Sequence, residues 1–144
     1  GALNTDYQID ANKCLAYYSI EHRQTIPIKY WKHFNKSIFG CDICQQVCPY
    51  NKKAKPATHS YLKIKNLPEL KKIALMDQQD YINYFSGTPM TRAKKNGLQR
   101  NALIAMVVTK DPSLENTLEK LKCEKDNLIQ ETIKQISKFY LLSQ

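Results

Sequence analysis

The stretch Gly40-Cys41-Asp42-Ile43-Cys44-Gln45-Gln46-Val47-Cys48-Pro49 places three cysteines in the pattern C-x2-C-x3-C-P. This is most of the run C-x2-C-x2-C-x3-C-P, whose thiolates hold [4Fe–4S] cubanes and whose last cysteine ligates the other cubane of a pair. Ile38 stands where the first cysteine of the full run would be, so one ligand is missing locally. Cys14, 27 residues before Cys41, is the natural replacement. The stretch therefore predicts a metal site formed by its three thiols and Cys14.

The thiols leave two alternatives open. A C-x2-C pair with one or two further cysteines also forms structural zinc sites, and free cysteines occur as ordinary core residues. The Cys48-Pro49 ending and the x3 spacing favour iron–sulfur over zinc. Cys123 lies among charged residues, with Lys122 before it and Glu124 after it, and we expect an ordinary thiol there.

The composition narrows the class of protein. The chain has 144 residues and 42% hydrophobic residues, which suits one globular domain or two small ones sharing a core. The longest apolar run, Ala102 to Val108, is too short to cross a bilayer, so we expect no membrane partner. An odd cysteine count without a secretory signal argues against a disulfide framework and favours a cytoplasmic protein. A net charge of +9 favours an acidic partner, nucleic acid first and a membrane surface second.

Residues 1–53 form the first of two expected regions and contain four of the five cysteines. We expect Asp10 to cap the first helix of this region. The expected local features, in chain order, are a helix over Ala11–His22, a short helix over Ile28–Phe34 after Pro27, and a tight turn at Gly40. A lysine-rich linker, Lys52 to Lys65, follows this region.

Residues 54–144 form the second expected region, in which apolar residues recur at helical spacing. The expected helices cover Leu67 to Ala74, Asp77 to Phe85 with a stop at Gly87, Leu98 to Thr109, Asp111 to Leu121, and Asp126 to Tyr140. Two antiparallel amphipathic helices after a third, apolar one are typical of a helical repeat unit. One repeat cannot bury its apolar face alone, so this unit should pack on the helix before it.

Several further motifs show a family resemblance across nearly the whole chain. They are Asp10-Ala11-Asn12-Lys13-Cys14, Ser19-Ile20-Glu21-His22, Ile26-Pro27, Phe39 to Asn51, Gly87-Thr88-Pro89-Met90-Thr91-Arg92 and Gly97-Leu98-Gln99-Arg100-Asn101-Ala102. In this order and spacing they resemble epoxyqueuosine reductase. The resemblance implies a mainly α fold: a partial ferredoxin-like cluster-binding segment (1–53) followed by a HEAT-like antiparallel helical region (54–144).

The resemblance also implies that the chain is the C-terminal part of a longer enzyme. In the family a cobalamin-binding catalytic domain and a first cysteine run ending in Cys-Pro-Thr-Gly-Ala-Leu come first. Gly1-Ala2-Leu3 resembles the tail of that phrase. We therefore expect this part alone to be inactive, and we assign it no catalytic residue.

The resemblance assigns ligands and cofactor contacts. Cys14, Cys41 and Cys44 would ligate one [4Fe–4S] cluster, and Cys48 would cross over to a second. Neither cluster would have its full ligand set within this chain. The parent enzyme would reduce epoxyqueuosine to queuosine in tRNA at a cobalamin, with the clusters supplying electrons. Cys41, Asp42, Ile43 and Cys44 would then face the cobalamin.

The resemblance gives the basic charge a specific partner, tRNA. The expected phosphate contacts are Arg92, Lys94, Lys95 and Arg100, a cationic stretch without an acid. The other expected partners are the cobalamin domain of the same chain and an unidentified electron donor. Two alternatives stay open: a stand-alone ferredoxin-type electron-transfer module and a zinc-stabilised nucleic-acid-binding module.

Overall fold

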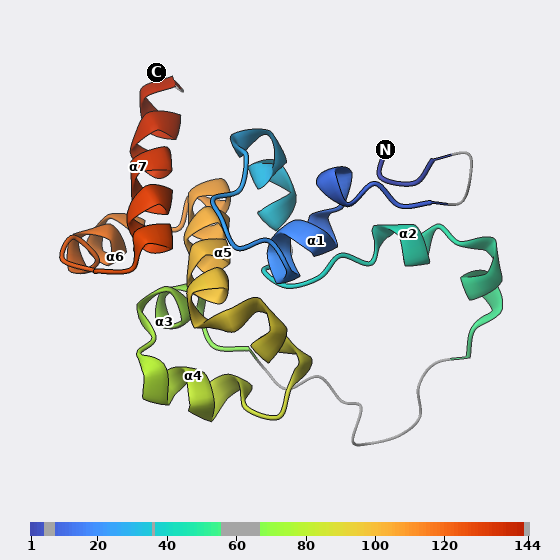
Figure 1. Cartoon of the computed structure of the whole chain (residues 1–144), viewed down its shortest axis with the longest axis horizontal. Helices are drawn as coiled ribbons and strands as arrows, with labels where there is room; N and C mark the ends of the chain where they lie inside the picture. The colour runs from blue at the N-terminus through green and yellow to red at the C-terminus, as the bar shows by residue number, and fades with distance from the viewer. Residues whose placement is uncertain (5–7, 36, 56–66, 143–144) are drawn as a thin grey trace.

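The computed structural model describes residues 1–4, 8–35, 37–55 and 67–142. Within these ranges the regular secondary structure is helical, apart from one isolated antiparallel bridge between Leu3 and Ile9, and loops and turns join the helices. The elements are η1 (Ala11–Lys13), α1 (Leu15–Ile20), η2 (Ile28–Asn35), α2 (Ile43–Gln46), η3 (Pro49–Lys53), α3 (Leu70–Leu75), α4 (Gln78–Phe85), η5 (Pro89–Ala93), α5 (Lys94–Thr109), α6 (Leu114–Lys120) and α7 (Asn127–Leu142), where η marks a 3-10 helix (Figure 1).

Helix α5 is the centre of the molecule. Every residue from 97 to 107 is buried, and the helix contacts α1, α3, α6, α7, η2 and η5. This confirms the expected burial, although the helix begins four residues earlier than predicted, at Lys94 rather than Leu98. Helices α6 and α7 both pack on α5, as expected for a repeat-like unit that cannot bury its apolar face alone.

The prediction of one continuous helix over Ala11–His22 is wrong, because the structure divides this segment into two helical pieces at Cys14. The Asp10 side chain accepts a hydrogen bond from the Asn12 amide and caps the short turn η1, as predicted for its capping role. Cys14 then has extended backbone angles, and α1 begins at Leu15. The break places the Cys14 thiol at a junction between two helical turns.

Several expected helix ends are confirmed. Asp77 caps α4 by accepting a hydrogen bond from the Asp80 amide, and Asp126 accepts one from the Ile129 amide at the start of α7. Gly87, just after α4, has a φ of 71°. The helix expected at Asp111-Pro112 begins at Leu114 instead, because the Asp111 side chain accepts the Ser113 amide in a turn.

The two expected regions share one hydrophobic core. Tyr18, Trp31 and Phe34 from the first region are buried in the same cluster as residues of α3, α5 and α7. The boundary at residue 53 therefore stays a prediction, and linker residues 56–65 lie outside the described part of the chain. Among the described residues, no helix has both the length and the apolar character needed to cross a membrane.

Replacing each of two glycines with alanine is expected to change the free energy of unfolding in opposite directions. Gly97→Ala is expected to raise the free energy of unfolding by about 0.5 to 1 kcal/mol, because alanine restricts the unfolded chain and its Cβ fits in the helix. That Cβ would meet only Ala93 Cβ, at 3.9 Å. Gly40→Ala should lower the free energy by about 1 to 2 kcal/mol, since its φ of 77° suits only glycine. Urea unfolding measures both, and two changes of the same sign would contradict the assignment.

Candidate metal centre

The structure brings three of the four predicted metal ligands to one place. Cys14, Cys41 and Cys44 line a cavity of about 560 Å³. Cys14 comes from the junction of η1 and α1, whereas Cys41 and Cys44 come from the turn after Gly40 and the start of α2. Two segments far apart in sequence therefore present their thiols to the same space.

The other cysteines lie elsewhere. Cys48 is half-buried at the position before η3 and does not line this cavity. Cys123 is exposed just after α6. The described thiols thus divide into a group of three, a separate Cys48 and an isolated Cys123.

Basic residues line the same cavity as the three thiols. They are Lys13, Lys29, Lys32 and His33. The sequence prediction did not assign these residues to the site. Lys13 directly precedes Cys14, whereas the other three belong to η2, which the fold brings to the same cavity.

Two tyrosines hold the backbone next to Cys14. The hydroxyls of Tyr18 and Tyr30 both donate to the Asn12 carbonyl, at 3.1 and 2.7 Å. Their ring centroids are 4.7 Å apart, and Tyr30 also lines the thiol cavity. Burial raises the pKa of Tyr18, which keeps its hydroxyl protonated as a donor.

Arg100 is buried, so the prediction that it contacts a phosphate is wrong. Its side chain is 1% exposed, and its guanidinium donates to the carbonyls of Tyr18, His22 and Gln24 at 2.6 to 2.8 Å. Burial lowers the pKa of Arg100 to about 10, so it stays charged at neutral pH. The guanidinium does need a partner, as the sequence suggested, but backbone carbonyls provide it.

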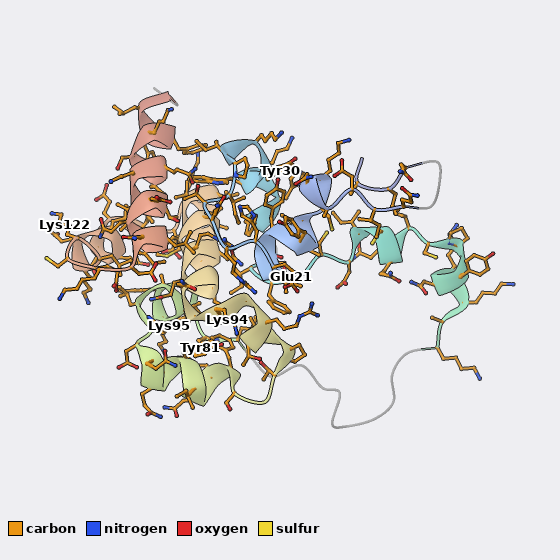
Figure 2. The ribbon with its side chains drawn as sticks, in the orientation of Figure 1. Glu21, Tyr30, Tyr81, Lys94, Lys95 and Lys122 are labelled. Atoms are coloured by element: carbon orange, nitrogen blue, oxygen red, sulfur yellow. The ribbon has the colours of Figure 1, made fainter. Side chains whose placement is uncertain are left out.

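The other three cations predicted to contact tRNA lie around the start of α5. Arg92 is exposed and forms an ion pair with Glu21, and Lys95 Nζ donates to Gln99 Oε1 at 3.2 Å. Lys94 is exposed and has a φ of 63°, a conformation that non-glycine residues rarely adopt. Figure 2 labels Lys94 and Lys95 next to each other, whereas Lys122 is labelled apart from them at the left edge of the view.

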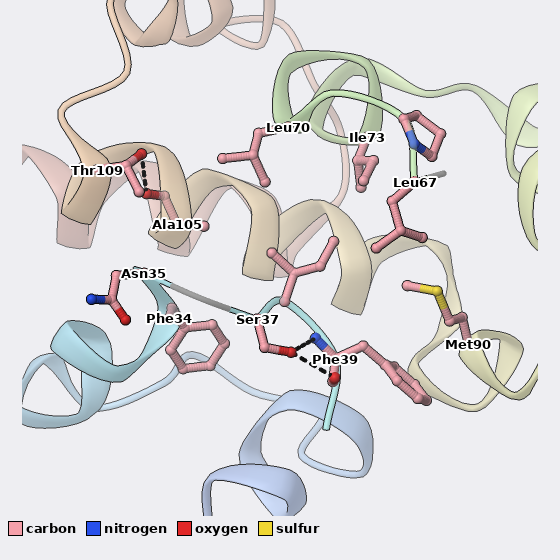
Figure 3. A pocket seen from close by; sticks show the side chains of 12 residues that line it. Phe34, Asn35, Ser37, Phe39, Leu67, Leu70, Ile73, Met90, Ala105 and Thr109 are labelled. Carbon is pink, nitrogen blue, oxygen red and sulfur yellow. Dashed lines mark hydrogen bonds between the residues drawn. The ribbon is translucent and has the colours of Figure 1, made fainter. Parts of the chain in front are cut away.

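A second cavity, of about 530 Å³, lies between residues 34–35 and 37–39 on one side and helices α3 and α5 on the other (Figure 3). Its lining is mostly apolar and includes Phe34, Ile73 and Met90. The Ser37 hydroxyl donates to the Phe39 carbonyl at 2.8 Å, within its own loop. The residues that line this cavity include no cysteine, histidine or carboxylate, so the thiol cavity is the candidate metal site.

Comparison with known proteins agrees with this site. Residues 1–51 match the family model of a 4Fe-4S double cluster binding domain. The chain is 35% identical over 98 residues to an epoxyqueuosine reductase of Leadbetterella byssophila, covering 67% of this chain and 32% of that protein. It is 30% identical over 122 residues to that of Pseudomonas aeruginosa, covering 83% and 33%. The chain therefore spans about a third of the length of these relatives.

Solved structures agree in fold. The structure of epoxyqueuosine reductase from Streptococcus thermophilus matches with a TM-score of 0.79 and 26% identity, over 92% of this chain and 35% of that chain. An epoxyqueuosine reductase crystallised with an epoxyqueuosine-modified tRNA-Tyr stem loop matches with a TM-score of 0.76 and 25% identity, over 88% and 34%.

The thiol cavity lies within residues 1–51, which match a 4Fe–4S double cluster binding domain, so the chain is an iron–sulfur protein of mainly helical fold. Over the part that it spans, the chain belongs to the epoxyqueuosine reductase family.

Proposed function

We propose that this chain is the electron-relaying part of an epoxyqueuosine reductase. Cys14, Cys41 and Cys44 ligate one [4Fe–4S] cluster, and Cys48 ligates a second. The observation that carries the proposal is the single cavity lined by three thiols from two separate segments. The match of residues 1–51 to a double cluster binding domain supports the same assignment.

The pattern C-x2-C-x3-C-P supports a cluster over a zinc ion, because the Cys48-Pro49 ending and the x3 spacing are those of cubane-binding runs. Among the described residues, no group of three His, Cys, Asp or Glu side chains lies close enough to hold a single metal ion. A cubane instead takes one thiolate at each iron corner. The three thiols around the cavity suit three such corners, and the fourth ligand comes from outside the described residues.

The cluster loop also has a surface suited to a cofactor or domain contact. Ile43, Val47 and Tyr50 are 59%, 66% and 91% exposed, so the segment from α2 to η3 presents apolar side chains outward. We propose that Cys41, Asp42, Ile43 and Cys44 face a cobalamin held by another part of the enzyme. The cobalamin, when bound, supplies the reduction of the epoxide, which consumes two electrons and two protons and releases water. This chain's residues hold the clusters that deliver the electrons one at a time.

Anaerobic reconstitution with iron and sulfide tests this proposal. A small external thiol in the buffer can take the fourth corner of the cluster held by Cys14, Cys41 and Cys44. We expect about four irons and four sulfides per chain, with the electron paramagnetic resonance signal of a reduced [4Fe–4S] cluster. Eight irons would contradict the ligand assignment, and tightly bound zinc without sulfide would favour the zinc alternative.

We further propose that the surface around the start of α5 binds tRNA. Arg92, Lys94 and Lys95 supply three cations there, and the N-terminus of this 16-residue helix adds the positive end of its dipole. Phosphates are the ligand that such a surface favours. The tRNA stem loop bound to a similar reductase supports this partner.

Charge reversal tests the RNA surface. Lys94→Glu with Lys95→Glu is expected to weaken binding of an anticodon stem-loop RNA by about tenfold or more, because two phosphate contacts are lost. The slope of log affinity against log salt should fall in magnitude by about 1 to 2. The matched control is Lys120→Glu with Lys122→Glu, at two exposed lysines at the end of α6 and just after it, which changes the net charge equally. Equal loss in both double variants would mean that only net charge matters and would reject the surface.

A further inference from the structure

One buried side chain on α5 connects the two segments that carry the thiols of the cavity. Asn101 Nδ2 donates to the Ser19 carbonyl and to the Ile38 carbonyl, both at 2.8 Å. Ser19 belongs to α1, which begins directly after Cys14, and Ile38 comes three residues before Cys41. A single amide group therefore bridges the Cys14 segment and the Cys41 segment.

Two further contacts complete this connection. The Ser19 hydroxyl accepts a hydrogen bond from the Gly40 amide at 3.0 Å, directly next to Cys41. Arg100 Nε and Nη2 donate to Asn101 Oδ1 at 3.1 and 2.9 Å. Because a guanidinium only donates, it orients the Asn101 oxygen towards itself and leaves the Nδ2 hydrogens for the two carbonyls.

The α5 side chains of this connection are buried. Asn101 and Arg100 are 0% and 1% exposed, and both Nδ2 bonds of Asn101 join residues at least 63 positions away in sequence. The carbonyls that Arg100 binds, from Tyr18 to Gln24, belong to the same α1 segment. The helical region therefore holds the thiol-bearing segments through buried hydrogen bonds as well as apolar packing.

We propose that Asn101, oriented by Arg100, is a positioning residue of the iron–sulfur site. It sets the separation of the Cys14 thiol from those of Cys41 and Cys44. This inference rests on the proposed function, since it concerns the cluster that these thiols hold. Outer partners that orient metal ligands typically change metal affinity by about 10- to 100-fold when removed. They also tune the reduction potential of a cluster.

The test compares Asn101→Ala with Gln99→Ala. Gln99 is a matched control, because it is a buried amide of the same helix that donates to two carbonyls, those of Ala74 and Met76. Those carbonyls lie at α3 and just after it, away from the thiol segments. After reconstitution of the whole chain, Asn101→Ala should show about tenfold weaker cluster retention against a chelator. Its residual cluster should have a shifted midpoint potential and an altered resonance line shape.

Gln99→Ala should keep the wild-type cluster signals even where it lowers the melting temperature. Equal cluster properties in Asn101→Ala and wild type would overturn the inference, as would equal changes in both variants. If Asn101→Ala does not fold, Asn101→Asp gives a second test, since it keeps an oxygen that accepts from Arg100 and removes the Nδ2 donor to both carbonyls. A wild-type cluster in Asn101→Asp would then overturn the inference.

A measurement without any metal separates this inference from the proposed function. In a chain with Cys44, Cys48 and Cys123 changed to Ser, a short bismaleimide can join only Cys14 and Cys41. Adding Asn101→Ala should slow this cross-linking by about tenfold, in line with lost ligand orientation. Equal rates, or no cross-linking in either protein, would overturn the inference. Failure of the wild-type chain to take up iron and sulfide would instead contradict the proposed function.

Discussion

Replacing Arg100 with Met is expected to lower the free energy of unfolding by about 3 to 5 kcal/mol. Met has a similar length but donates no hydrogen bond, so the carbonyls of Tyr18, His22 and Gln24 lose their buried donor. Each buried group left without a partner costs about 1 to 3 kcal/mol, and the three costs are not fully additive. Urea unfolding followed by circular dichroism measures the change.

Arg92→Met is the control for this prediction. Arg92 is also an arginine with a partner, Glu21, but its side chain is 68% exposed. An exposed ion pair contributes little, so the expected loss is below about 1 kcal/mol. Arg100→Lys should fall between wild type and Arg100→Met, since one ammonium group cannot replace three planar donors. Similar losses for Arg92→Met and Arg100→Met would contradict the structural role of Arg100.

Changing Cys41 to Ser is expected to reduce cluster iron by about tenfold or more after anaerobic reconstitution, because a hydroxyl replaces one of the three thiolates. Cys14→Ser and Cys44→Ser should behave in the same way, since all three line one cavity. The loss is measured as iron and sulfide per chain and as visible absorption. It should occur without a loss of helical content, because the three thiols contribute no large apolar surface to the core.

Cys123→Ser and Cys48→Ser distinguish the ligand groups. Cys123 is exposed and remote in sequence from the cavity, so Cys123→Ser should retain all of the iron. Cys48 does not line the cavity, so Cys48→Ser should retain the cluster held by the other three thiols. A loss of iron in Cys48→Ser equal to that in Cys41→Ser would mean that all four thiols hold one cluster.

The local features of the fold could largely be predicted from the sequence. The caps at Asp77 and Asp126, the turn at Gly40 and the buried character of α5 depend on neighbouring residues and on helical spacing. The division at Cys14 could not be predicted in this way. Residues 11–20 have the composition of one helix, and the 3-10 turn is stabilised by Tyr30, whose hydroxyl comes from 18 positions away.

The candidate site was only partly predictable, because some of its features depend on neighbouring residues and others on residues distant in sequence. The spacing C-x2-C-x3-C-P predicts Cys41, Cys44 and Cys48 as ligands, because runs of this spacing hold paired cubanes, with the last cysteine on the other cubane. Asn101 and Ser19 lay in motifs that the sequence marked, yet nothing in those motifs assigned them a role. Their partners are backbone carbonyls and amides 21 to 82 residues away.

The sequence by itself determined the chemistry available to this chain: which thiols can bind metal, which segments are amphipathic helices and that the chain carries a net charge of +9. Only the tertiary structure decided that Cys14 meets Cys41 and Cys44, and that Arg100 faces backbone carbonyls rather than solvent. The physical reason is that a thiol or a guanidinium has the same bonding capacity wherever it lies. Its partner is set by the packing of α5 against segments that are distant in sequence.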